Sequence, residues 1–316
     1  MRAIFQWKIG SRTLELGRRT LIMGVVNVTP DSFSDGGLYI DAAKAVAYAE
    51  RLLDDGAAII DVGGESTRPG VVVSAAPAAT ADAGAAAGTS SSGSSSSSHA
   101  VSEEEERNRV LPVIRDLKKR RPEAVISIDT YKSGVARAAV DLGAEVVNDI
   151  SGFRWDAKMS KTLAELKVGA VLMHTRGRPE EWSTLPPIGD PVLLVKRDLR
   201  QWAEAATLAG VKRDHLVLDP GFGFGKRLEE NYPLLAHFGE LQQMGFPLLA
   251  GVSRKSFIGR ALARDGKDAP VEDRIYGTMA AEAVLILKGA HIIRTHDVAL
   301  ASRAAQMLDA IVASGG

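Results

Sequence analysis

Eight short apolar runs in this 316-residue chain end on a polar or ionisable side chain. The residues that end them are Asn27, Asp61, Asp129, Asn148, His174, Asp219, Ser253 and Arg294. If the runs are parallel strands of one barrel, their ends open on one face and these side chains converge there. A cluster of carboxylates, amides and cations is suited to a ligand that has both a polar ring and an anionic group.

The string DPGFGFGK, residues 219–226, places a carboxylate at a strand end where Pro220 and Gly221 turn the chain. Such a carboxylate can accept two parallel N–H bonds from an amidine-like ring edge. An aspartate that only caps its own turn is the alternative. The glycines lack the dinucleotide-binding spacing, and a phosphate-binding loop would need Gly in place of Pro220 and Ser or Thr in place of Arg227.

Asp129 and Asn148 close the third and fourth apolar runs, so they are expected to be neighbours around the rim. Together they could present an acceptor and a donor to the other side of the same ring. The alternatives are that Asp129 caps a helix beginning near Tyr131 and that Asn148 serves the turn at Asp149.

Two further strings carry cations. Lys255 in GVSRKSFIG, residues 251–259, could bond a ring carbonyl and add positive charge near a departing anion, or it could be a surface lysine. The spacing around Ser253 fails the known serine-nucleophile patterns.

Arg294 and His296 lie two residues apart on an extended segment, which suits the binding of a diphosphate. The alternative is that both are solvated side chains at the rim of the barrel. Barrel enzymes often bind phosphate after their seventh and eighth strands.

Two loops are rich in turn formers and in polar side chains. In NVTPDSFSDGG, residues 27–37, Asp31 and Asp35 could close over a ligand, or the segment could be a plain connector. In GGESTRPG, residues 63–70, Thr67 and Arg68 could clamp an anion, or Arg68 could pair with a surface acid.

The elements that must position these residues alternate along the chain. Residues 4–16 predict a hairpin that plugs the floor of a barrel. Strands are expected near 21–27, 57–61, 125–129, 145–149, 169–174, 215–219, 247–252 and 291–294. Helices are expected at 41–55, 103–120, 131–142, 157–167, 190–209, 229–243, 271–288 and 297–313, with Ser102 as one N-cap. Eight such units predict a single (β/α)8 TIM barrel over residues 1–316, and an open doubly wound α/β sheet is the competing fold.

One segment interrupts this alternation. Residues 71–100 are almost entirely Ala, Ser, Gly and Thr after the initial valines, and they fall in the loop after the second predicted strand. Such a composition cannot bury enough apolar surface to offset its ordering entropy, so we expect a disordered, low-complexity insertion. A barrel can tolerate it, because doubling the length of a flexible loop costs only about 0.6 kcal/mol.

The composition is that of an ordinary globular protein and excludes several function classes. Lys plus Arg equals Asp plus Glu at 39 each, so no global field would attract nucleic acid or an anionic membrane. The chain has no cysteine, which excludes disulfides, thiolate catalysis and cysteine-ligated metal. Its first residues lack the apolar core of a signal peptide, and no run is long enough to span a bilayer, so we expect a cytoplasmic protein.

Seven strings in this order closely resemble the motifs of the bacterial dihydropteroate synthase family. They are NVTPDSFSDGG, DVGGESTRPG, SIDT, NDISG, DPGFGFGK, GVSRKSFIG and RTHDV. The resemblance covers the whole chain except the insertion. It implies a pterin-binding (β/α)8 barrel that condenses 6-hydroxymethyl-7,8-dihydropterin diphosphate with p-aminobenzoate, giving 7,8-dihydropteroate and diphosphate in folate biosynthesis. It also implies a homodimer, a Mg2+ cofactor and competition by sulfonamides.

The resemblance also assigns roles to matching positions. Asp129, Asn148, Asp219 and Lys255 would bind the pterin. Asn27, Arg68, Arg294 and His296 would bind the diphosphate, with Asn27 also placing Mg2+. Thr67, Arg68, Phe224 and Ser253 would border the p-aminobenzoate pocket. Asp35 and Lys255 would be the catalytic residues, with Asp35 near the developing cation. Thr175 stands where the family often has Met, and we expect little effect from this difference.

Two alternatives stay open. Methyltransferase domains that use methyltetrahydrofolate and a corrinoid share the pterin-binding barrel, but they lack the DSFSD, TRPG and RTH strings that a diphosphate substrate explains. A non-catalytic paralogue that binds a pterin or a protein partner would keep the fold, and the insertion after Gly70 leaves room for such a role.

Overall fold

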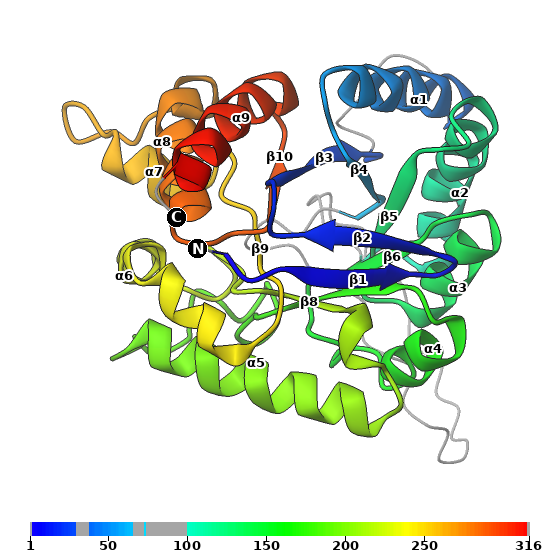
Figure 1. Cartoon of the computed structure of the whole chain (residues 1–316), viewed down its shortest axis with the longest axis horizontal. Helices are drawn as coiled ribbons and strands as arrows, with labels where there is room; N and C mark the ends of the chain where they lie inside the picture. The colour runs from blue at the N-terminus through cyan, green and yellow to red at the C-terminus, as the bar shows by residue number, and fades with distance from the viewer. Residues whose placement is uncertain (1, 30–37, 66–72, 74–99, 315–316) are drawn as a thin grey trace, which may run out of the picture.

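The computed structural model describes residues 2–29, 38–65, 73 and 100–314. For residues 38–41 it describes the backbone alone. Eight parallel strands form one sheet in the order β8, β7, β6, β5, β4, β3, β10, β9 (Figure 1). A parallel bridge between Leu218 and Leu248 joins its two ends. The sheet therefore closes into the predicted (β/α)8 barrel, and the open-sheet alternative is wrong. The strands are β3 (Leu21–Asn27), β4 (Ile59–Gly63), β5 (Val125–Asp129), β6 (Val146–Asp149), β7 (Gly169–Met173), β8 (Leu216–Asp219), β9 (Leu249–Ala250) and β10 (Ile292–Thr295).

Helices surround the barrel. They are α1 (Leu38–Asp54), α2 (Glu103–Arg120), α3 (Ser133–Asp141), α4 (Met159–Leu166), α5 (Pro191–Leu208), α6 (Asn231–Ala236), α7 (Ser256–Ala261), α8 (Ile275–Leu287) and α9 (Val298–Ser314). The predicted cap of α2 is confirmed, because the Ser102 side chain accepts a hydrogen bond from the Glu105 N–H at 3.1 Å. None of the helices within the described ranges combines the length and apolar character needed to cross a bilayer.

The single helix predicted for residues 229–243 is wrong. The chain instead forms a 3-10 turn at Leu228–Glu230, the short helix α6, and a second 3-10 segment at Phe238–Met244. Pro233 lacks the N–H that a continuing helix needs, and Gly239 weakens the helix further on. The predicted helix 271–288 similarly begins with a 3-10 turn, Val271–Arg274, before α8.

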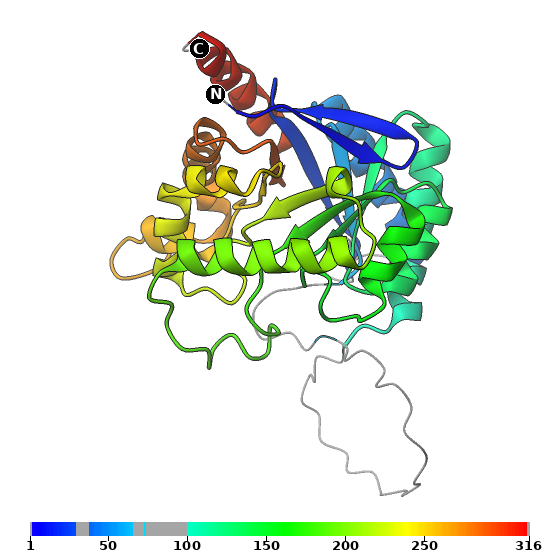
Figure 2. The same cartoon turned by 60° about the horizontal axis from the view of Figure 1, so that its bottom comes forward.

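The predicted hairpin is confirmed, with β1 (Phe5–Ile9) paired antiparallel to β2 (Arg12–Leu16). It lies across the end of the barrel at which the strands begin (Figure 2). Trp7, Ile9 and Leu16 are buried against one inward-facing side chain or more from every barrel strand. The Trp7 indole N–H also donates a hydrogen bond to the His215 carbonyl at 2.8 Å. The hairpin therefore closes the barrel floor and keeps water from its apolar lower layer.

The insertion at 71–100 lies outside the described residues except for Val73 and Ala100. Val73 is buried in an apolar cluster with Tyr131, Ile150, Trp155 and Met173, and the side chain of Phe224 packs against this cluster. The predicted disorder of the insertion stays a prediction.

Helix α8 buries a carboxyl group against the barrel. The Glu282 side chain is 4% exposed, and its Oε1 has no hydrogen-bond partner among the described residues. Burial raises the pKa of Glu282 to about 7, while a hydrogen bond with Thr295 opposes the shift. The position therefore favours the protonated form more strongly than water does.

Shortening a buried side chain of the β1–β2 hairpin should destabilise the barrel. We expect Trp7→Ala to lower the free energy of unfolding by about 3–5 kcal/mol, because it removes a fully buried indole and leaves a cavity. The measurement is urea unfolding followed by circular dichroism. Gln6→Ala, on the exposed face of the same strand, is the control and should change the value by no more than about 0.5 kcal/mol. Equal effects of the two variants would contradict the conclusion that the hairpin stabilises the barrel by closing its floor.

Glu282 should make stability depend on pH. Because its folded pKa of about 7 lies above the reference value of 4.5, the folded protein binds this proton more tightly. The stability it contributes is fully present below pH 4.5 and is lost as the pH rises through 7, a change of about 3 kcal/mol. Urea unfolding between pH 4.5 and pH 8 should show this loss in the parent protein and not in Glu282→Gln. The control is Glu272→Gln at an exposed position; parallel curves for all three proteins would exclude the effect.

Candidate functional site

Strand register brings the predicted polar residues to one level at the carboxyl end of the barrel. Gly63 of β4 lies level with Asn27 of β3 on one side and with Asp129 of β5 on the other. Asp129 in turn lies level with Asn148 of β6. The apolar floor side chains sit two, four or six residues earlier on the same strands. Since side chains alternate between faces, the polar residues also point inward.

A charge network crosses this mouth. The Arg294 guanidinium donates from Nε to Asp61 Oδ2 at 2.6 Å and from Nη2 to Asp129 Oδ2 at 2.7 Å. Asn148 Nδ2 donates to the same Asp61 oxygen at 3.0 Å. Asp61 Oδ1 and Asn148 Oδ1 are buried and have no hydrogen-bond partner among the described residues. Because unpaired buried polar atoms are rare in native proteins, these two oxygens indicate a place where a ligand donates hydrogen bonds.

The pKa of Asp129 is raised to about 7, first because the group is buried. The Arg294 cation opposes this shift, whereas the nearby Asp61 carboxylate adds to it. For Asp129, burial and the neighbouring carboxylate therefore favour the protonated form, and the Arg294 cation favours the charged one. The alternative in which Asp129 serves as a helix cap is wrong, because α3 begins at Ser133 with Lys132 at its N-cap position.

Asp219 ends β8 and is 4% exposed. Its Oδ1 accepts a hydrogen bond from the Gly221 N–H at 2.7 Å, so the turn-capping alternative holds for one of its two oxygens. Burial raises the pKa of Asp219, and the Gly221 N–H and the Lys255 cation oppose that rise. A carboxylate held in this way keeps acceptor capacity for a ligand.

Lys255 is not a freely solvated surface lysine. It is half-buried, its ammonium donates to the Phe222 carbonyl, and its Nζ lies 4.4 Å from the centroid of the Phe224 ring. Burial lowers the pKa of Lys255 to about 7, with the Asp219 carboxylate acting in the opposite direction. The amine therefore lies between a carboxylate and an aromatic face at the mouth.

Ser253 and His296 are joined across the ends of β9 and β10. Ser253 Oγ lies 3.0 Å from His296 Nδ1 and accepts a hydrogen bond from the His296 N–H at 3.3 Å. Burial lowers the pKa of His296 to about 4, and the Arg294 cation adds to this effect. The imidazole is therefore neutral near pH 7 in the free protein.

Phe224 forms an aromatic wall beside these residues. Its ring meets the Trp182 indole edge to face, with centroids 5.4 Å apart and planes at 81°. Trp182 comes from the loop between β7 and α5, and the sequence reasoning missed it because nothing in that loop marks its partner. With Lys255 over Phe224, the two rings place apolar aromatic surface next to a cation.

The structure brings together most of the predicted site but leaves three of its residues undescribed. Asp35, Thr67 and Arg68 lie outside the described residues, and their roles stay predictions. Asn27 is exposed at the mouth. Asp61 was expected at the mouth but received no specific role from the sequence, and the structure shows it fully buried there, accepting hydrogen bonds from Arg294 and Asn148.

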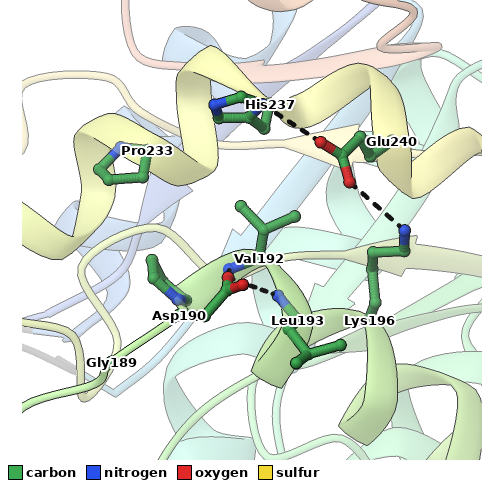
Figure 3. A pocket seen from close by; sticks show the side chains of 9 residues that line it. Gly189, Asp190, Val192, Leu193, Lys196, Pro233, His237 and Glu240 are labelled. Carbon is green, nitrogen blue, oxygen red and sulfur yellow. Dashed lines mark hydrogen bonds and ion pairs between the residues drawn. The ribbon is translucent and has the colours of Figure 1, made fainter.

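A separate cavity of about 420 Å³ lies between α5 and the segment that follows β8 (Figure 3). Its charged side chains already have partners: Glu240 lies 3.2 Å from His237 and 3.5 Å from Lys196, and Asp190 accepts hydrogen bonds from the first N–H groups of α5. None of the mouth residues lines it. In the described part of the chain, no three His, Asp or Glu residues are arranged to hold a metal ion.

Comparisons with known proteins agree with this geometry. Residues 23–81 and 88–296 match a family model described as pterin binding enzyme. The chain is similar to the dihydropteroate synthase of Clostridium beijerinckii, with 42% identity over 306 residues, covering 96% of this chain and 99% of the relative. It is also similar to the Xanthomonas albilineans dihydropteroate synthase solved with 4-aminobenzoic acid, with 38% identity, a TM-score of 0.82, and coverage of 98% and 99% of the two chains.

A third similar protein is the Yersinia pestis dihydropteroate synthase solved in a sulfonamide drug complex. It shares 35% identity with this chain at a TM-score of 0.82, covering 98% of this chain and 100% of the other. This similarity extends over the barrel, the N-terminal hairpin and the residues at the mouth. The chain therefore belongs to the dihydropteroate synthase family of pterin binding enzymes.

Proposed function

We propose that this protein condenses 6-hydroxymethyl-7,8-dihydropterin diphosphate with p-aminobenzoate to form 7,8-dihydropteroate and diphosphate, a step of folate biosynthesis. One observation carries the proposal: the buried network of Arg294, Asp61, Asp129 and Asn148, which leaves two buried oxygens unpaired beside Asp219 and Lys255. A pterin ring, with its row of N–H donors and its carbonyl, supplies the groups that such a cluster lacks.

The pterin would lie deep in the mouth. Asp219 would accept two N–H bonds from the amidine-like edge of the ring, and Lys255 would donate to the ring carbonyl. Asn148 and Asp129 would bond the other side of the ring. The Oδ1 of Asn148 supports this orientation, because it is a buried acceptor without a partner among the described residues, while Nδ2 of the same amide already donates to Asp61.

The diphosphate would lie at the outer rim, near Asn27, Arg68, Arg294 and His296. The bonds to Asp61 and Asp129 use two of the five N–H donors of the Arg294 guanidinium, so donors remain for an anion. His296 is neutral in the free protein because burial lowers its pKa to about 4. An anion bound beside it would favour its protonated form.

The p-aminobenzoate would enter between Phe224 and Ser253, with Thr67 and Arg68 on the loop after β4. The rings of Phe224 and Trp182 offer apolar aromatic surface against which a benzene ring can pack. The complexes of two relatives with 4-aminobenzoic acid and with a sulfonamide drug support a shared pocket, in which sulfonamides would compete with p-aminobenzoate.

In the reaction, the amine lone pair forms the new C–N bond at the exocyclic methylene carbon. The C–O bond to diphosphate breaks, the diphosphate leaves with the electron pair, and the nitrogen loses one proton. Arg294, Arg68 and Lys255 would stabilise the departing negative charge, and Asp35 would lie near the positive charge that develops on the methylene. No enzyme nucleophile is required, which agrees with the lack of cysteine.

We further propose Mg2+ as the cofactor, held by Asn27 and by the diphosphate itself. The donor chemistry fits, because Mg2+ prefers oxygen ligands and is commonly bound through few protein groups plus substrate phosphates. The exposed amide of Asn27 at the mouth could supply one such oxygen. When bound, the ion would neutralise charge on the leaving diphosphate. A homodimer and a cytoplasmic location are further proposals, which rest on the family resemblance and on the composition.

Turnover tests the main proposal. Incubation with the pterin diphosphate and Mg2+ should release diphosphate only when p-aminobenzoate is added, and mass spectrometry should detect dihydropteroate. Tight pterin binding without amine-dependent release would favour the non-catalytic paralogue. Methyl transfer from methyltetrahydrofolate to a corrinoid would favour the methyltransferase reading.

A single substitution tests how the pterin is recognised. Asp219→Asn keeps an oxygen for the Gly221 N–H but replaces the charged acceptor with an amide. We expect kcat/KM for the pterin diphosphate to fall roughly 100-fold or more, since hydrogen bonds to charged groups contribute about 1.5–3 kcal/mol each. Asp141→Asn, at an exposed position, is the control and should retain parental activity. Unchanged kcat/KM in Asp219→Asn would remove Asp219 from the pterin site.

The metal proposal is tested by binding rather than by turnover. Isothermal titration of diphosphate should show tighter binding with Mg2+ than without it, and Asn27→Ala should weaken only the Mg2+-dependent binding, by about tenfold or roughly 1.4 kcal/mol. The paired titrations without Mg2+ are the control. If Asn27→Ala weakens binding equally in both conditions, Asn27 contacts the anion and does not hold the metal.

A further inference from the structure

A buried lysine lies beneath the loop of residues 219–226. Lys226 is 7% exposed, and its Nζ lies 2.7 Å from the Gly221 carbonyl oxygen, 3.3 Å from that of Phe224 and 3.4 Å from that of His174. Within the described residues it forms no salt bridge with a carboxylate. The lysine therefore sits in a cradle of backbone carbonyls, with no role in the reaction described above.

The cradle is built for a cation. Burial holds the pKa of Lys226 well below its usual range, and the nearby Lys255 adds to this effect. Three carbonyl oxygens nevertheless surround the amine, and a neutral amine has only two N–H donors. Only the ammonium form can donate to all three, and carbonyl dipoles pointing at the nitrogen stabilise its charge.

The glycines of the loop explain how the carbonyls converge. Gly221, Gly223 and Gly225 all have positive φ, at 62°, 79° and 63°. A side chain at Gly221 would place its Cβ 1.9 Å from the His174 oxygen, and one at Gly225 would come within 2.5 Å of the Arg176 oxygen. The backbone can therefore press against the end of β7 and turn its carbonyls toward Lys226.

The same loop carries the groups that face the ligand. Asp219 begins it, Phe222 supplies the carbonyl that accepts from Lys255, and Phe224 supplies the aromatic wall. The two shorter contacts of Lys226, at 2.7 Å and 3.3 Å, go to the carbonyls of Gly221 and Phe224. Gly221 donates to Asp219, and Phe224 is itself the aromatic wall. Loss of the ammonium would remove this donor from the His174 and Phe224 carbonyls, whereas the Gly221 carbonyl would keep its hydrogen bond from the Phe224 N–H at 3.2 Å. The loop would then be held less firmly.

We propose that Lys226 is a positioning residue whose ammonium acts as an internal cation and holds the loop of residues 219–226 in place. The loop then keeps Asp219 in position to bind the pterin and Phe224 in position to contact p-aminobenzoate. The proposal rests on the proposed synthase function for its kinetic consequences. The cradle itself does not depend on that function, so the two can be tested separately.

The test removes the ammonium and then returns it from solution. We expect Lys226→Ala to lower kcat/KM for p-aminobenzoate by roughly 100-fold, the loss typical of a displacement of about 1 Å, mainly through a higher KM. Ethylammonium should enter the vacated cradle and restore kcat/KM in a saturable manner. Ethanol, which is neutral, should not. Lys226→Met is the matched variant: it fills the space without the charge and should be impaired but not rescued.

Thermal unfolding provides a readout independent of turnover. Ethylammonium should raise the Tm of Lys226→Ala and leave the Tm of Lys226→Met and of the parent protein unchanged. Parental kinetics in Lys226→Ala, or equal rescue by ethanol and ethylammonium, would overturn the proposal. If the parent protein lacks amine-dependent diphosphate release, the synthase function fails instead, and the Tm comparison still decides whether the cradle binds a cation.

Discussion

The mouth of this barrel depends on one guanidinium shared between two carboxylates. Arg294 bonds Asp61, which is fully buried, and Asp129 across the top of the barrel. Charges placed this deep are costly unless they are paired, and removing one partner of such a group typically costs about 3–5 kcal/mol. The pairing needs β4, β5 and β10 in one closed register, so the ion pairs tie the shape of the site to closure of the barrel.

The layer below makes this arrangement possible. Inward-facing apolar side chains from every barrel strand, capped by Trp7, Ile9 and Leu16 of the hairpin, form a dry floor. A polar layer can then sit an even number of residues further along the strands, because side chains alternate between the faces of a strand. The floor excludes water from beneath the charges. Their remaining unpaired atoms, Asp61 Oδ1 and Asn148 Oδ1, belong to this same polar layer.

Much of this was predictable from the sequence. The apolar runs indicated the strands to within a few residues, because strands buried on both faces must be apolar throughout. The helix at 229–243 was predicted wrongly, because the prediction followed the apolar spacing and did not weigh the missing N–H of Pro233 or the low helix propensity of Gly239. Trp182 was missed because its partner, Phe224, lies about 40 residues further along the chain. Lys226 was missed because its partners are backbone carbonyls, which the residue types do not reveal.

The sequence by itself determined the (β/α)8 class, the family resemblance, and the residue types at the ends of the strands. These are local properties of hydrophobic pattern and turn chemistry. Only the tertiary structure decided that Arg294 pairs with Asp61 and Asp129, that Ser253 meets His296, and that Lys255 lies over Phe224. The reason is physical: burial and the distances between charges set hydrogen bonds and pKa values, and both are fixed only when distant strands close into one barrel.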